Sequence, residues 1–250
     1  MKNALFQYLL RIGDTNLVLS HRLSELCSRG PFLEEDIALT NIALDHIGQA
    51  EALLKYAGEV EGRGRSEDDL AYLRSEVEFR NCLLVEQPNT DFAYVIVRQF
   101  FIDVWEGLLY NALSTSKDET LAGMGTRFAK ETAYHFRHSG SWMVRLGQGT
   151  EESHRRLDQA FRDLWHYTGE LFETDDNETQ LAEAGIAPRS DSFRAAWLDK
   201  VKQVAEDAGL ALPATDYMAS GGRVGIHSEH LGHLLAEMQY LQRAYPGAKW

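Results

Sequence analysis

DFAYVIVRQFFIDVWEGLLYNAL, residues 91–113, is a long and mostly apolar stretch near the middle of the chain. Its apolar residues recur with the 3.6-residue period of an α-helix and do not alternate with polar residues as in a β-strand. Almost every other segment shows the same helical period, and almost none alternates. The sequence therefore predicts an all-α protein.

The long helices expected around this stretch form two pairs. A first helix is stopped by Gly30-Pro31, and a second runs from there to about Ala57, where glycines interrupt it. On the other side of 91–113, SKDE at 116–119 resembles a capping box that opens a fourth helix, which should end near Gly147.

The two helix pairs are separated by a crossover of about 30 residues with a helix of its own. A capping box at Ser66–Asp69 should open this helix, which then extends to about Leu84. Two pairs of long helices joined by one long crossover are typical of the ferritin-like four-helix bundle.

The remaining third of the chain also has helical periodicity, at 151–173, 191–207 and 228–243. No linker between these segments is long or biased enough to indicate a second domain. We therefore expect a single domain over 1–250, with a four-helix core at 1–150 and additional helices at 151–250 packed on it.

The composition excludes several classes of protein. With 44% hydrophobic and 25% charged residues the chain is typical of globular proteins, and no apolar run approaches the roughly 20 residues of a membrane span. The net charge of −13 opposes binding to nucleic acid, and the two cysteines suggest neither a disulfide framework nor a structural zinc site. The N-terminus lacks the features of a signal peptide, so we expect a cytoplasmic protein.

The first helix is apolar on both sides. Leu5, Leu9 and Ile12 belong to one stripe, yet Leu10 and Val18 occupy the opposite side. A helix that is apolar nearly all round must be covered on two faces, which indicates a partner subunit and predicts at least a dimer, with a second copy as the possible partner when the chain is alone.

A ferritin-like bundle raises the question of a di-iron site, which takes one Glu from each of two helices and a Glu-x-x-His from each of the other two. The carboxylates at matching heights of the four helices are Asp14, Asp45, Asp103 and Glu131. Three of these four have the shorter Asp side chain, which reaches about 1.5 Å less far than Glu. The ligand set is therefore irregular.

Both imidazoles of such a site are expected to be missing or displaced. Gly48 stands three residues after Asp45, and Tyr134 stands three residues after Glu131, while His135 comes one position late. A Glu and a His four residues apart are more often a hydrogen-bonded or solvated pair than metal ligands. Hydrogen bonds and internal ion pairs could replace a metal at these positions.

Two further polar groups have alternative interpretations. Asp45 lies in one lane with Asn41 and Gln49, which favours a buried polar network over a metal site. His227, His230 and His233 stand at intervals of three residues, which on an α-helix spreads them over about 120°. Zinc binding by these histidines is therefore disfavoured, and capping, surface or interface roles are expected.

Several long blocks resemble the C-subunit family of the phenylacetyl-CoA 1,2-epoxidases, also called ring 1,2-phenylacetyl-CoA monooxygenases. The similarity runs from end to end and is most distinctive at the C-terminus. The blocks are RIGDTNLVLSHRLSELC at 11–27, DIALTNIALDHIGQA at 36–50, LLVEQPNTDFAYVIVRQFFIDVW at 83–105, KETAYHFRHSGSWMVRLGQGT at 130–150 and GIHSEHLGHLLAEMQYLQRAYPGAKW at 225–250.

The resemblance implies a non-catalytic, ferritin-like subunit that supports a related catalytic A subunit. In that system a reductase subunit passes electrons from NADPH, and the di-iron centre of the A subunit uses dioxygen to epoxidise the aromatic ring of phenylacetyl-CoA. It implies no cofactor in this chain, and Asp14, Asp45, Asp103 and Glu131 would be vestigial ligand positions. The expected partners are the A subunit and, through it, the other subunits, with neither nucleic acid nor a membrane.

Two other functions remain open at this point. The chain could itself be a di-iron or di-manganese oxidase or oxygenase with an irregular site, which the residues at 48 and 134 argue against. It could also be a free-standing helical binding module, which predicts a monomer without an A-type partner.

Overall fold

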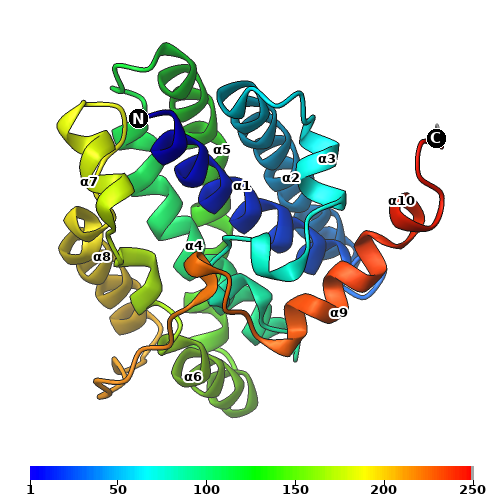
Figure 1. Ribbon diagram of the computed structural model, residues 1–250. Coiled ribbons are helices and arrows are strands. Elements are labelled where there is room, and N and C mark those ends of the chain that lie inside the picture. The colour runs from blue at the N-terminus through cyan, green and yellow to red at the C-terminus, as the bar shows by residue number, and fades with distance from the viewer. Residues whose placement is uncertain (249–250) are drawn as a thin grey trace. The chain divides into compact units, whose positions relative to one another are not determined.

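A computed structural model describes residues 1–248, which contain helices, turns and loops but no β-strand (Figure 1). The all-α prediction is confirmed. The last two residues of the PGAKW ending lie outside the described residues. The helices are α1 (Lys2–Ser24), α2 (Leu33–Glu61), α3 (Glu67–Tyr72), α4 (Phe92–Leu113), α5 (Glu119–Gly147), α6 (Glu151–Trp165), α7 (Asp176–Glu183), α8 (Arg194–Asp207), α9 (Glu229–Met238) and α10 (Tyr240–Ala244).

The order of these elements is that of the ferritin-like fold. Two long helices, α1 and α2, are followed by a crossover with short helical turns and then by two more long helices, α4 and α5. No helix within residues 1–248 has both the length and the apolar character that crossing a membrane requires.

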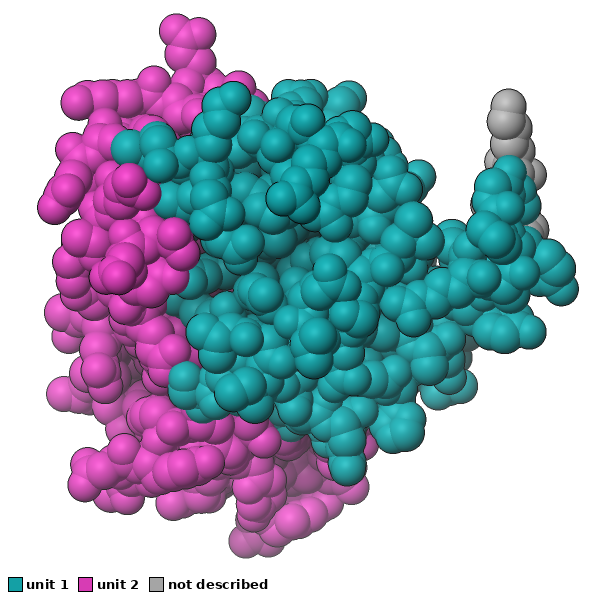
Figure 2. Space-filling view, viewed as in Figure 1, with its two compact units in different colours: residues 1–88, 220–250 teal, residues 89–219 magenta. Residues whose placement is uncertain are grey.

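The chain divides into two compact units, drawn in teal and magenta in Figure 2. The first unit contains residues 1–88 and 220–250, and the second contains residues 89–219. The C-terminal residues therefore belong with α1 and α2, and neither unit boundary coincides with the expected division at residue 150. The single domain over 1–250 stays a prediction.

In the first unit α1 packs along α2 so closely that a Cβ on Gly13 would come within 2.9 Å of Leu54. Helix α2 does not stop at Gly58 but continues to Glu61, where Gly62 takes the left-handed conformation that ends many helices. A Cβ on Gly58 would lie 2.2 Å from the carbonyl oxygen of Arg65, so the returning chain requires glycine there.

Two helices of the first unit are shorter than predicted. Helix α1 ends at Ser24, before Gly30, in a series of turns that includes Ser28 with φ of 69°. The capping box of Ser66 is present, but α3 ends at Tyr72, because Ser75 begins a new turn with a capping box of its own. Two 3₁₀ turns follow, at Glu76–Glu78 and Leu83–Glu86.

The chain buries α1 nearly all round. Residues of both its stripes are largely inaccessible to solvent, and Leu10 and Val18 on the predicted outer side are 3% and 0% exposed. The outer side of α1 therefore needs no second subunit to cover it, and this ground for predicting a dimer is wrong.

In the second unit α4 packs against α5, α6 and α8. The Asp91 carboxylate caps α4 by accepting from the Tyr94 N–H at 2.9 Å. Asp118, rather than Ser116, caps α5 by accepting from the Leu121 N–H at 3.0 Å. The buried indole of Trp197 donates to the Phe101 carbonyl at 3.0 Å and so fixes α8 against α4.

Candidate functional site

The inner face of α5 decides how the predicted pair Glu131 and His135 is arranged. This face is a run of buried residues at three- and four-residue intervals: Leu121, Gly125, Phe128, Thr132, His135, Ser139 and Met143. Glu131 is one position away from this lane, and its carboxylate accepts from Arg127 Nε at 3.0 Å. His135 thus lies in the buried lane, whereas Glu131 stands beside the lane and pairs with Arg127.

A similar one-residue difference occurs on α2. His46 and Gln49 are fully buried, whereas Asp45 is only half-buried and Asn41 is exposed. The predicted lane of Asn41, Asp45 and Gln49 is therefore wrong, because only Gln49 faces inward. His46 Nδ1 lies 2.7 Å from the Asn16 side-chain oxygen of α1, and since that oxygen only accepts, Nδ1 carries the hydrogen.

The two buried histidines, His46 and His135, can be compared with the Glu-x-x-His motifs of a ferritin-like site. Three residues before His46 stands Ala43, and three residues before His135 stands Thr132, both of them buried. Compared with a Glu-x-x-His motif, these two buried pairs have the imidazole but no carboxylate three residues before it. The predicted ligand set used another register, with carboxylates at Asp45 and Glu131 and no imidazole three residues later, and that assignment stays a prediction.

Asp14 is fully buried on α1 and bound to two arginines of the crossover. Arg74 makes a two-pronged ion pair with it, with Nη1 donating to Oδ2 at 2.9 Å and Nη2 donating to Oδ1. The backbone N–H of Arg80 also donates to Oδ2, at 2.8 Å. A carboxylate whose two oxygens are held in this way is an ion-pair partner and not an available metal ligand, as the ion-pair alternative anticipated.

Asp103 is 1% exposed on α4 and is held by two polar side chains. Gln99 Nε2 donates to one carboxylate oxygen at 2.7 Å, and Ser139 Oγ of α5 donates to the other at 2.6 Å. Burial raises the pKa of Asp103 to about 8, and the two hydrogen bonds lower it by less. The group is therefore largely protonated at neutral pH.

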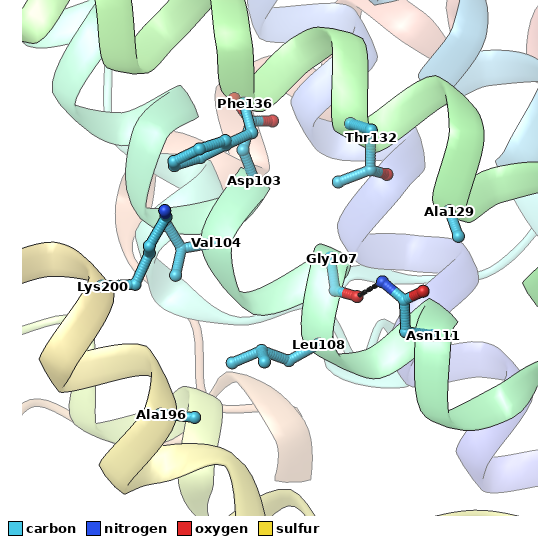
Figure 3. Close-up of a pocket in the computed structure, with 11 residues that line it drawn as sticks. Asp103, Val104, Gly107, Leu108, Asn111, Ala129, Thr132, Phe136, Ala196 and Lys200 are labelled. Atoms are coloured by element: carbon cyan, nitrogen blue, oxygen red, sulfur yellow. Dashed lines mark hydrogen bonds between the residues drawn. The ribbon is translucent and has the colours of Figure 1, made fainter.

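A pocket of about 330 Å³ opens beside Asp103 between α4, α5 and α8 (Figure 3). Val104, Leu108, Phe136 and several alanines make its wall mostly apolar. Thr132 also lines it, and its buried hydroxyl has no hydrogen-bond partner among residues 1–248. Lys200 lies at the rim, with its ammonium 5.0 Å from the Phe136 ring centre. The pocket suits a small, largely apolar molecule.

The three C-terminal histidines lie in different surroundings. His227 precedes α9 and is held by Glu86, with Nδ1 2.5 Å from a carboxylate oxygen, whereas His233 is exposed on the helix. Although burial acts to lower the pKa of His227, its hydrogen bond and charge attraction to Glu86 raise it overall. The backbone carbonyl of His230 accepts a hydrogen bond from the Arg22 side chain at 3.2 Å. His227 lies outside the helix, and the expectation that the three histidines do not converge on one ion stays a prediction.

The sequence model of the phenylacetic acid catabolic proteins matches residues 1–250. The chain belongs to this family. It is 48% identical, over 99% of its own length and the whole length of the relative, to the C subunit of the 1,2-phenylacetyl-CoA epoxidase of Escherichia coli strain K12.

For this member of the phenylacetic acid catabolic family, the residues at the ligand positions do not fit a ferritin-like di-iron centre. Asp14 is occupied by arginines, Glu131 lies outside the buried lane, and Ala43 and Thr132 stand where the bridging carboxylates of two helices would be. The buried face of α5, and with it His135, could have been found from the sequence, since Leu121, Phe128 and Met143 already define that face.

Proposed function

We propose that this chain is a non-catalytic structural subunit of a phenylacetyl-CoA epoxidase. In this role it supports a catalytic A-type subunit that holds the di-iron centre and receives electrons through a reductase, in the cytoplasm. The observation that carries the proposal is the loss of carboxylate at Ala43 and Thr132, while the imidazoles of the same motifs remain. Two octahedral irons need bridging carboxylates, and imidazoles alone do not replace them.

The ion pair of Asp14 and Arg74 supports the same proposal. A buried carboxylate in a bundle needs a counter-charge, and here an arginine of the crossover supplies it in place of a metal. Asp14 therefore links α1 to the crossover instead of binding a metal. This role fits a subunit whose function is structural.

The alternative is a metal-dependent oxidase or oxygenase, and the buried imidazoles of His46 and His135 are the observation that favours it. Iron content separates the two functions. We expect the chain produced alone in iron-rich medium to bind far less than one iron per chain. Near-stoichiometric iron that is lost in a His46→Gln/His135→Gln variant would overturn the structural role.

Co-expression tests the supporting role directly. The A-type subunit should be recovered soluble and active with this chain and should lose solubility or turnover without it. Glu131→Gln should leave turnover of the complex unchanged, because Glu131 lies outside the buried lane of α5 and its carboxylate pairs with Arg127. A free-standing binding module would instead be recovered as a monomer that does not co-purify with the A-type subunit.

A further inference from the structure

Helix α2 carries an exposed apolar stripe along its outer face. Leu33, Ile37, Leu44 and Ile47 are 69%, 53%, 61% and 38% exposed. At 100° per residue, their positions fall within an arc of about 80° on the helix surface. They therefore form one continuous face and are not scattered single residues.

The opposite face of α2 is also apolar and is fully used within the chain. Leu39, Ile42, Leu53 and Ala57 on this inner face are at most 2% exposed. A helix that is apolar on both faces is typical of one that is covered on both. The covering that the sequence predicts for α1 is thus missing at α2, where the chain leaves about four turns of apolar surface open.

The residues within and beside the stripe indicate how a partner would fit. Thr40 and Gly48 are small and stand between the large apolar side chains, so another helix could approach closely there. The rim is acidic, with Glu34, Asp36 and Glu51 next to the stripe. Lys55 is the basic residue at its C-terminal end.

This charge distribution disfavours a second copy as the occupant. Two α2 stripes packed together would bring acidic rims of chains with a net charge of −13 against each other, and like charges at an interface reduce affinity. A different chain with basic residues around an apolar helix face is complementary in both respects.

We propose that Leu33, Ile37, Leu44 and Ile47 of α2 form the surface that binds the A-type subunit, whose matching face is an apolar helix with a basic rim. This inference rests on the proposed function, and it names the part of the chain that performs it. The relative from Escherichia coli is itself described as a subunit, which implies further chains around it.

Binding of the purified A-type subunit, measured by titration calorimetry or biolayer interferometry, tests the surface. Buried apolar anchors at interface centres commonly dominate affinity. The Ile37→Glu/Leu44→Glu variant should therefore bind at least about 100-fold more weakly than the unchanged chain. Because both side chains are already exposed, the variant should keep its circular dichroism spectrum and melting temperature.

Leu198→Glu is the matched control, since Leu198 is a 38% exposed leucine on another helix, α8. This variant should bind as tightly as the unchanged chain. Raising the salt concentration should weaken binding of the unchanged chain, because the acidic rim contributes attraction.

The outcomes separate the surface from the function. Equal affinity of the double variant and the unchanged chain would overturn the α2 surface and leave the supporting role intact. An unchanged chain that binds no A-type subunit would contradict the proposed function itself. A dimer of the chain alone that light scattering shows to dissociate in the double variant would assign the stripe to a second copy and overturn the proposed partner.

Discussion

Replacing Asp103 with Asn should change how the stability of the protein depends on pH. The side chain is 1% exposed, and burial raises its pKa to about 8 from the usual 3.8. The folded state therefore retains a proton that the unfolded chain releases. Asparagine has nearly the same shape, can accept from Gln99 and does not titrate.

The magnitude follows from proton linkage. Between about pH 4 and pH 8 the folded protein binds one more proton at this position, so the free energy of unfolding decreases by about 1.4 kcal/mol per pH unit. The stability from this proton is fully present below the unfolded pKa and is lost as the pH rises through the folded pKa. From about pH 5 to pH 8 the loss is about 3 to 4 kcal/mol.

Urea unfolding of Asp103→Asn and the unchanged protein at about pH 5, 6, 7 and 8, followed by tryptophan fluorescence, measures this difference. The variant should gain about 3 to 4 kcal/mol relative to the unchanged protein across that range. Asp199→Asn, at an exposed position of α8, should show no such trend. A constant difference between Asp103→Asn and the unchanged protein at all pH values would refute the buried, protonated carboxyl.

Two other perturbations address the first unit. Arg74→Met should lower the free energy of unfolding by about 3 to 5 kcal/mol, because it leaves the buried Asp14 without its cation. Adding Asp14→Asn should recover part of that loss in thermal or urea unfolding. A loss below about 1 kcal/mol in the single variant would contradict this. His227→Gln should destabilise the protein more at about pH 6 than at about pH 9, because pairing with Glu86 raises the pKa of His227 in the folded state. The stability from this pairing is fully present below the unfolded pKa of about 6.5 and is lost as the pH rises through the folded pKa. An equal effect at both pH values would show that the charge contributes nothing.

Much of the helical framework could be predicted because its signals are local. Asp91 and Asp118 stand at the starts of α4 and α5, and their caps depend on neighbouring backbone N–H groups. The end of α5 near Gly147 is equally local. Helix α7 was not predicted, since the acidic residues at its start also suit a loop.

The ligand positions were harder to predict because a one-residue change of register depends on which face is buried. On α2, Leu44 and Ile47 of the outer stripe compete with Ile42 and Leu53 of the inner face, so periodicity gives no single inward direction. Asp45 therefore looked as well placed as His46. The pairing of Asp14 with Arg74, 60 residues later, is a tertiary contact that no local pattern encodes.

The first unit is made from the two ends of the chain, and this affects the order in which the protein can fold during synthesis. Arg22 on α1 donates to the carbonyl of His230, 208 residues away, and Gln239 donates to carbonyls of Ala71 and Arg74. The ribosome releases α1 first, yet α1 must wait for almost the whole chain before these bonds can form. Residues 89–219 are continuous and can complete their unit earlier. The nascent chain therefore finishes its middle before its beginning, and premature termination near residue 219 would leave the first-made helices without their C-terminal partners.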